Sequence, residues 1–209
     1  MDQPHRGGNQ IWSLVVKDNF LIWKYKSVDG ACVLKDLRGL EKTFRLNNGT
    51  PLAAGFPGDV AFHMHPDFPT DLLLVDNLLN SDMVIVASKR LQDCVRAQSP
   101  SEVEYLPVKI IDHKGRIASK DYAIIHPVRP VDCIDKQHSV FETNPIDPDD
   151  IETLEKLVID EAKIPDDRRL FRMQGFWGMT LVRNALAAAI AAGGFSGVEF
   201  LSIDDYPEA

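Results

Sequence analysis

Two histidines and an aspartate lie close together in the stretch VAFHMHPDFPTD, and all three belong to residue types that bind metal ions. One residue separates His63 from His65, and Asp67 follows two positions later. On an extended chain, residues i and i+2 point to the same face. Two imidazoles and a carboxylate there could hold a zinc ion, with one position open for water, as in a metal-dependent hydrolase.

The context of this stretch favours a different interpretation. Four prolines between positions 51 and 69 predict a stiff loop with little regular structure. The chain contains no H-E-x-x-H pattern. We therefore expect a loop whose histidines do no chemistry, and we expect no metal or cofactor. The hydrolase using His63, His65 and Asp67 remains the alternative.

A second set of candidate catalytic residues lies in VDCIDKQHSVFE, where Asp132, Asp135, His138 and Ser139 are close in sequence. A serine, a histidine and an acidic residue are the components of a hydrolytic triad, but triad members usually lie far apart in the sequence. The chain has no G-x-S-x-G nucleophile elbow. We interpret the segment as a turn capped by Asp135 and Ser139.

Acidic residues cluster from position 147 to position 155. They do not follow the D-x-D-x-D-G spacing of a calcium loop. A solvated acidic linker is the first interpretation of this run, and a docking surface for a basic partner is the second. The residues are Asp147, Asp149, Asp150, Glu152 and Glu155.

Phe176 and Trp177 stand between two glycines in FRMQGFWGM. If exposed, they would be ready anchors for a protein interface. Large aromatic residues are more often buried, so we favour a core-facing loop and keep the interface as the alternative.

The composition bounds the class of protein. The chain has 209 residues, of which 44% are hydrophobic and 26% are charged, as in ordinary globular proteins. Its net charge of −8 argues against a nucleic-acid partner. No apolar run approaches the roughly 20 residues of a membrane span, so we expect no membrane partner. Three dispersed cysteines in apolar contexts suggest reduced thiols and a cytoplasmic protein.

The elements that must position these residues show an internal correspondence. At an offset of 95 positions, SEVEYL (Ser101 to Leu106) lies over SGVEFL (Ser196 to Leu201) without a gap. Leu91 and Val95 fall on Leu186 and Ile190, which keeps one apolar helical face. The pattern predicts an α+β fold with two similar strand-helix-strand half-units, about 82–111 and 177–203, joined by β segments.

The predicted organisation along the chain has three parts. Residues 1–10 form a loose tail and residues 11–70 a β-rich N-terminal region. Residues 71–209 form an α+β region with a possible internal duplication, and the whole is one compact unit. Within the α+β region, Ser88 is a good N-cap for the helix KRLQDCVRAQ.

The order of segments from Leu72 to Ile203 resembles the immunity protein family eleven of bacterial polymorphic toxin systems. The pieces that carry the resemblance are VDCID, FRM and the terminal GVEF. The first 70 residues resemble the family only loosely.

The resemblance implies a cytoplasmic, non-catalytic protein that binds and neutralises a cognate toxin domain encoded by a neighbouring gene. It implies no cofactor. Besides the hydrolase, a general protein-interaction module without a toxin partner remains an alternative. Four residues match the family-like segment, and we expect them to be structural: Asp132, Cys133, Asp135 and Ser139.

Overall fold

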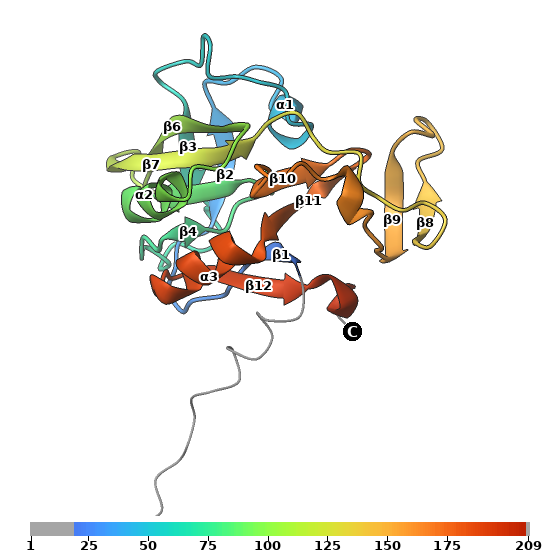
Figure 1. The fold of residues 1–209 in the computed structure, drawn as a ribbon. Helices are drawn as coiled ribbons and strands as arrows, with labels where there is room; N and C mark the ends of the chain where they lie inside the picture. Colours follow the sequence, from blue (N-terminus) through green and yellow to red (C-terminus); the bar gives the residue numbers. More distant parts are fainter. Residues whose placement is uncertain (1–18, 208–209) are drawn as a thin grey trace, which may run out of the picture.

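The computed structural model describes residues 19–207 and consists mainly of β-strands, with two longer helices (Figure 1). The predicted tail, residues 1–10, and the start of the predicted N-terminal β region lie outside the described residues. None of the helices in the described part has the length and apolar content that a bilayer span requires. The α+β class is confirmed.

Strands of the chain's two ends form a four-stranded sheet in the order β10-β11-β1-β12. All neighbours in it are antiparallel. Its strands are β1 (Phe20–Tyr25), β10 (Leu170–Met173), β11 (Phe176–Arg183) and β12 (Val198–Ser202).

The middle of the chain forms a six-stranded mixed sheet in the order β2-β3-β6-β7-β5-β4. Only β3 and β6 pair in parallel in it. Its strands are β2 (Leu34–Arg38), β3 (Ala61–Met64), β4 (Asn77–Leu78), β5 (Ile85–Ser88), β6 (Val103–Ile111) and β7 (Ile117–Pro127). The described part of the predicted N-terminal region therefore contributes strands to both sheets.

A separate antiparallel hairpin is formed by β8 (Val140–Thr143) and β9 (Ile151–Lys156). The helices are α1 (Phe44–Asn47), α2 (Lys89–Ala97) and α3 (Asn184–Ala192). Two short 3-10 turns, η1 (Glu161–Lys163) and η2 (Ile203–Asp205), follow β9 and β12.

The core is arranged around α2 and α3, which pack against each other and against the two sheets. Alternation along each strand sends successive residues to opposite faces. Leu21 and Trp23 of β1 thus enter the shared core with the helices, whereas Phe20 and Ile22 enter a second core beneath the hairpin. The outer face of the six-stranded sheet has its own core.

The two predicted strand-helix-strand units are present. In each unit, a third strand from another part of the chain lies between the unit's two strands in the sheet. In β5-α2-β6 the inserted strand is β7, where Ile124 lies between Val86 and Leu106. In β11-α3-β12 the inserted strand is β1, where Ile22 lies between Leu181 and Leu201.

The offset of 95 positions therefore relates residues at equivalent places in the two sheets. Val86 corresponds to Leu181 and Leu106 to Leu201. The helices meet at another such pair, since the Cys94 thiol donates to the Ala189 carbonyl at 3.8 Å.

Local signals explain the helix ends. The Ser88 side chain accepts a hydrogen bond from the Leu91 N–H at 3.3 Å, so the predicted N-cap of α2 is confirmed. α3 ends at Ala192 with Gly193 as its C-cap, and Gly194 follows in the left-handed region at φ 60°. This is the conformation that glycine adopts most readily after a helix.

Candidate partner-binding surface

The β8–β9 hairpin stands beside the two larger sheets, at the right of Figure 1. Ile151 and Leu154 of β9 are buried in the core below it, and Phe141 packs partly against the same core. Glu142, Glu152 and other polar side chains point to solvent. The acidic run is therefore not a linker, because its second half forms the paired strand β9, in which Ile151 and Leu154 are buried.

The hairpin loop, residues 144–150, is held by its own hydrogen bonds. The Asn144 side-chain oxygen accepts from the N–H groups of Ile146 and Asp147, at 2.8 and 3.1 Å. The Asn144 N–H donates to the Asp150 carbonyl at 2.8 Å, and the Asp150 N–H donates to the Asp147 carbonyl at 3.0 Å. Two prolines, Pro145 and Pro148, restrict the backbone further. The loop is thus pre-organised.

This loop presents an apolar side chain surrounded by carboxylates. Ile146 is 92% exposed, more than any other large hydrophobic residue among positions 19–207. We call residues 140–156 the acidic hairpin, since they carry six carboxylates and one lysine, a net charge of −5 in a chain of net charge −8. An exposed apolar residue at a rigid, charged tip is a feature of binding surfaces.

The two predicted parts of an interface, the acidic run and the aromatic pair, lie side by side. The Trp177 indole N–H donates to Asp150 Oδ1 at 3.0 Å. The Ile151 N–H donates to the Gly175 carbonyl at 2.7 Å, which joins the hairpin to the β10–β11 turn. Trp177 is half-buried, whereas Phe176 packs against the core below the hairpin. Both begin β11 rather than forming a loop.

Arg172 supports this surface from below. Its guanidinium donates to the carbonyls of Trp177 and Met83, the latter in the β4–β5 loop of the other sheet. The side chain is 2% exposed, and burial lowers the pKa of Arg172 to about 10. FRM was singled out in the sequence only for its resemblance to a family. Nothing in the pattern indicated that its arginine would be buried between the sheets.

The segment Asp132 to Ser139 forms the base of the hairpin. Asp135 Oδ1 accepts from the N–H groups of Gln137 and His138. The Ser139 hydroxyl donates to the Val158 carbonyl at 3.1 Å and accepts from the Val158 N–H at 2.9 Å. These bonds tie the chain that enters β8 to the chain that leaves β9.

The other polar contacts of the segment Asp132 to Ser139 are also structural. The Cys133 carbonyl accepts from the Asp160 N–H at 2.7 Å. Burial raises the pKa of the Cys133 thiol to about 12, which keeps it protonated. The His138 ring bonds to Asp135 at 2.7 Å, while Asp132 is exposed. Ser139 thus bonds to backbone groups of Val158, and His138 to Asp135.

His63 and His65 occupy different local structures. His63 lies in β3 and not in the expected loop, and burial lowers its pKa. His65 follows the strand, and its Nδ1 accepts from the Asp67 N–H at 3.1 Å. In the described residues, no three histidine, cysteine or acidic side chains come together in a group that could hold a metal ion.

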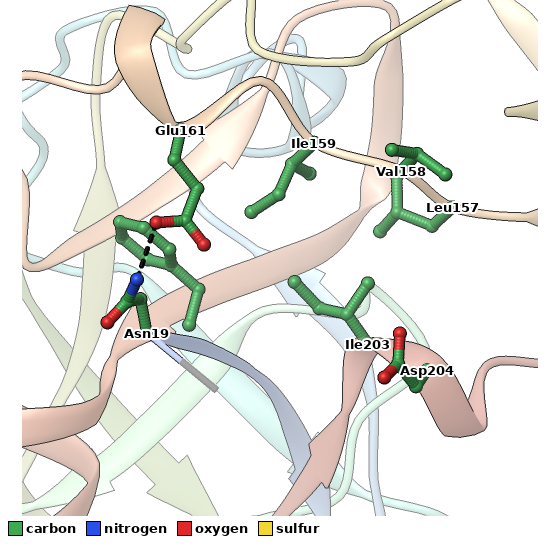
Figure 2. A pocket seen from close by; sticks show the side chains of 8 residues that line it. Asn19, Leu157, Val158, Ile159, Glu161, Ile203 and Asp204 are labelled. Carbon is green, nitrogen blue, oxygen red and sulfur yellow. Dashed lines mark hydrogen bonds between the residues drawn. The ribbon is translucent and has the colours of Figure 1, made fainter. Parts of the chain in front are cut away.

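A cavity of about 230 Å³ lies where β9 ends, and sequence reasoning gave no sign of it. Leu157, Val158 and Ile159 follow the hairpin directly and form one side of it. Figure 2 shows the residues that line the cavity, with Glu161 and Asp204 on opposite sides and Ile159 and Ile203 between them. These residues come from segments far apart in the sequence, which is why the pattern could not reveal the cavity.

Comparison with known proteins shows the family. No curated protein matches the chain. The model of the immunity protein family Imm11, however, matches residues 13–205, which extends the resemblance well into the N-terminal region that seemed only loosely similar. With nearly the whole sequence matched, the chain belongs to the immunity protein family Imm11.

Proposed function

We propose that the protein binds and neutralises a cognate toxin domain encoded by a neighbouring gene, acting in the cytoplasm as a binder and not as an enzyme. The observation that carries this proposal is the family match over residues 13–205. We assign the acidic hairpin, with the neighbouring Trp177, to the toxin-binding surface. No cofactor, nucleic acid or membrane takes part.

The pre-organised loop supports this assignment. Binding costs less when the contacting segment is already ordered. The Asn144 and Asp147 hydrogen bonds hold the loop in one conformation before any partner arrives. Ile146 then supplies the apolar anchor and Trp177 an aromatic one at the side of the hairpin.

The charge of the hairpin supports a basic partner. Its exposed carboxylates produce a local negative field, and Trp177 holds Asp150 beneath them. The exposed carboxylates are Glu142, Asp147, Asp149, Glu152 and Glu155. Such a field increases the rate of encounter with a positively charged surface, and salt reduces the effect. A stable interface needs about 800 Å² on each partner, so residues beside the hairpin must take part.

The first test is neutralisation by the complete chain. The product of the adjacent toxin-bearing gene is expressed in the native host, and growth is measured with and without this protein. A catalytically inactive form of that product is then purified with it. We expect restored growth and a stable one-to-one complex. Growth arrest in the presence of the folded protein, with no complex, would overturn the proposal and favour an interaction module with another partner.

The second test measures the role of the hairpin carboxylates. Asp147→Asn, Asp149→Asn and Glu152→Gln together should lower the association rate about tenfold at low salt, with a weaker salt dependence. The control variant, Glu41→Gln, Asp59→Asn and Asp121→Asn, removes the same charge from exposed positions on or beside the six-stranded sheet. Equal association rates for the two variants would exclude the hairpin from the binding surface.

A further inference from the structure

The cavity at the base of the acidic hairpin has the composition of a site for one long cationic side chain. Its volume of about 230 Å³ holds several waters or a single such side chain, at roughly 30 Å³ per water molecule. Phe20, Ile159 and Ile203 supply apolar walls. Glu161 and Asp204 supply carboxylates at the two ends of the group (Figure 2). Arginine and lysine can pack an apolar stem against these walls and place a charged head beside one of the two carboxylates.

The carboxylate of Glu161 is positioned by a neighbour. The Asn19 side-chain amide donates to Glu161 Oε2 at 2.6 Å, the dashed line in Figure 2. This bond orients the carboxylate and leaves its second oxygen, Oε1, to accept another donor. A side chain that is held in place before binding loses less conformational entropy on binding.

Among residues 19–207, no ion pair balances the negative charge of the cavity. Lys163, in the same short turn as Glu161, lies 4.0 Å from Asp160. Within residues 19–207, no lysine or arginine forms an ion pair with Glu161 or Asp204. A ligand that brings a positive charge would therefore meet two carboxylates that have no ion-pair partner among the described residues.

We propose that this cavity receives an arginine side chain of the toxin domain. The proposal rests on the proposed function and extends the binding surface from the acidic hairpin, which ends at Lys156, to the cavity that begins at Leu157. The stem of the arginine packs against Ile159 and Ile203. Its guanidinium donates to Glu161, with Asp204 adding a second negative charge. Arginine fits better than lysine, because its planar fork can donate to two acceptors at once.

A titration that needs no toxin tests the site itself. N-acetyl-arginine amide is added to the ¹⁵N-labelled protein, and the backbone amide resonances are followed by NMR. We expect shifts confined to the cavity residues, among them Ile159, Glu161 and Asp204, with a dissociation constant on the order of 1 mM. N-acetyl-citrulline amide has nearly the same shape without the charge, and it should leave these resonances in place.

The variant Glu161→Gln with Asp204→Asn should weaken arginine binding at least tenfold. The matched control, Glu41→Gln with Asp121→Asn, removes two exposed carboxylates from elsewhere and should bind as the wild type does. All four positions are exposed, so each variant should fold. Equal shifts with the citrulline compound, unchanged binding by the cavity variant, or no shifts at these residues would each overturn the proposal.

The toxin complex provides a second readout. The cavity variant should bind the inactive toxin domain about tenfold more weakly than the control variant does. If the wild type restores growth but arginine does not bind in the cavity, the inference fails and the proposed function stands. If arginine binds but the wild type neither restores growth nor forms a complex, the assignment of the arginine to a toxin is overturned together with the proposed function.

Discussion

Asp76 joins the segment before β4 to α2 and to the turn before β12. Its carboxylate accepts from the Ser88 hydroxyl at 2.7 Å, from Arg90 at 2.7 Å, and from the N–H and hydroxyl of Ser196, both at 2.9 Å. Burial alone would raise the pKa of Asp76, but these hydrogen bonds together lower it to about 2. One carboxylate thus links the two strand-helix-strand units.

We expect Asp76→Asn to lower the free energy of unfolding by about 1–3 kcal/mol at pH 7, because the amide cannot accept all of these bonds. A carboxyl whose pKa falls on folding stabilises the protein fully above the unfolded value. That contribution is lost as the pH falls from about 3.8 through about 2. The difference between variant and wild type should therefore shrink over this range in urea denaturation.

Asp93→Asn is the matched control. Asp93 pairs with Lys89 one helical turn away on an exposed face of α2, where such a pair contributes little. A loss of stability in Asp93→Asn as large as that in Asp76→Asn would contradict the special role of Asp76.

At the scale of elements, the turn before β12 lies close to the first residue of β4. The Asn77 N–H donates to the Ser196 carbonyl at 3.1 Å, and the Asn77 amide donates to the Gly197 carbonyl at 2.8 Å. Gly197 has φ 77°, and a Cβ added there would lie 2.2 Å from the Asn77 carbonyl oxygen. Only glycine leaves room for the two backbones to approach this closely.

Gly197→Ala should therefore destabilise the protein by about 3 kcal/mol or more, since it combines a left-handed backbone with a backbone clash. Gly194→Ala provides a control with a similar φ of 60° and nothing within 4 Å of the added Cβ. It should cost about 1 kcal/mol. Thermal and urea unfolding of both variants measure the difference, and equal losses would show that the close approach to Asn77 is not limiting.

Elements with strong local signals were predictable, and those defined by distant contacts were not. Ser88 and the spacing of Leu91 and Val95 specify α2 because capping and helical periodicity act within a few residues. The acidic hairpin was missed because Pro145, Pro148 and four aspartates or asparagines suggest a loop, while its buried residues, Ile151 and Leu154, are only two. The aromatic start of β11 was misplaced for a similar reason, since Gly175 and Gly178 flank it.

At the scale of the whole molecule, α2 and α3 share one core between the two sheets. Leu91, Val95, Leu186 and Ile190 are all buried there, together with Leu21 and Trp23 of β1 and Ile125 of β7. Neither sheet can lose this core without exposing apolar surface of the other. The two halves should therefore unfold together.

Leu186→Ala should cost about 2–5 kcal/mol, because the fully buried side chain leaves a cavity in the shared core. Urea unfolding should remain a single transition in circular dichroism and in tryptophan fluorescence, and hydrogen exchange should become faster to the same extent in β1 and β7. Ala192→Gly, at the exposed end of α3, is the control and should cost about 1 kcal/mol. Two separated transitions would refute the shared core as the source of cooperativity.

The repeated unit was visible in the sequence because, in each copy, equivalent residues of the two strands pair with the same residue of the inserted strand. Ile124 and Ile22 occupy equivalent places in the two sheets. The strand of Ile124, β7, follows its unit in the chain, whereas the strand of Ile22, β1, precedes its unit. That difference in connection is invisible to an ungapped comparison, so the sequence predicted the half-units but not which strands complete them. We propose an internal duplication as the origin of the pair. The cavity beside Ile203 was unpredictable, since three distant segments build it.

The hairpin loop can tolerate substitutions that the shared core cannot. Its shape is maintained by backbone bonds and by the side chains of Asn144 and Asp147, and none of these bonds reaches the rest of the chain. The exposed side chain of Ile146 takes no part in the core either. Substitutions at exposed positions such as Ile146 should change the proposed toxin-binding surface while leaving stability nearly constant. A protein built in this way can acquire a new binding specificity one tip residue at a time, without any compensating change in its interior.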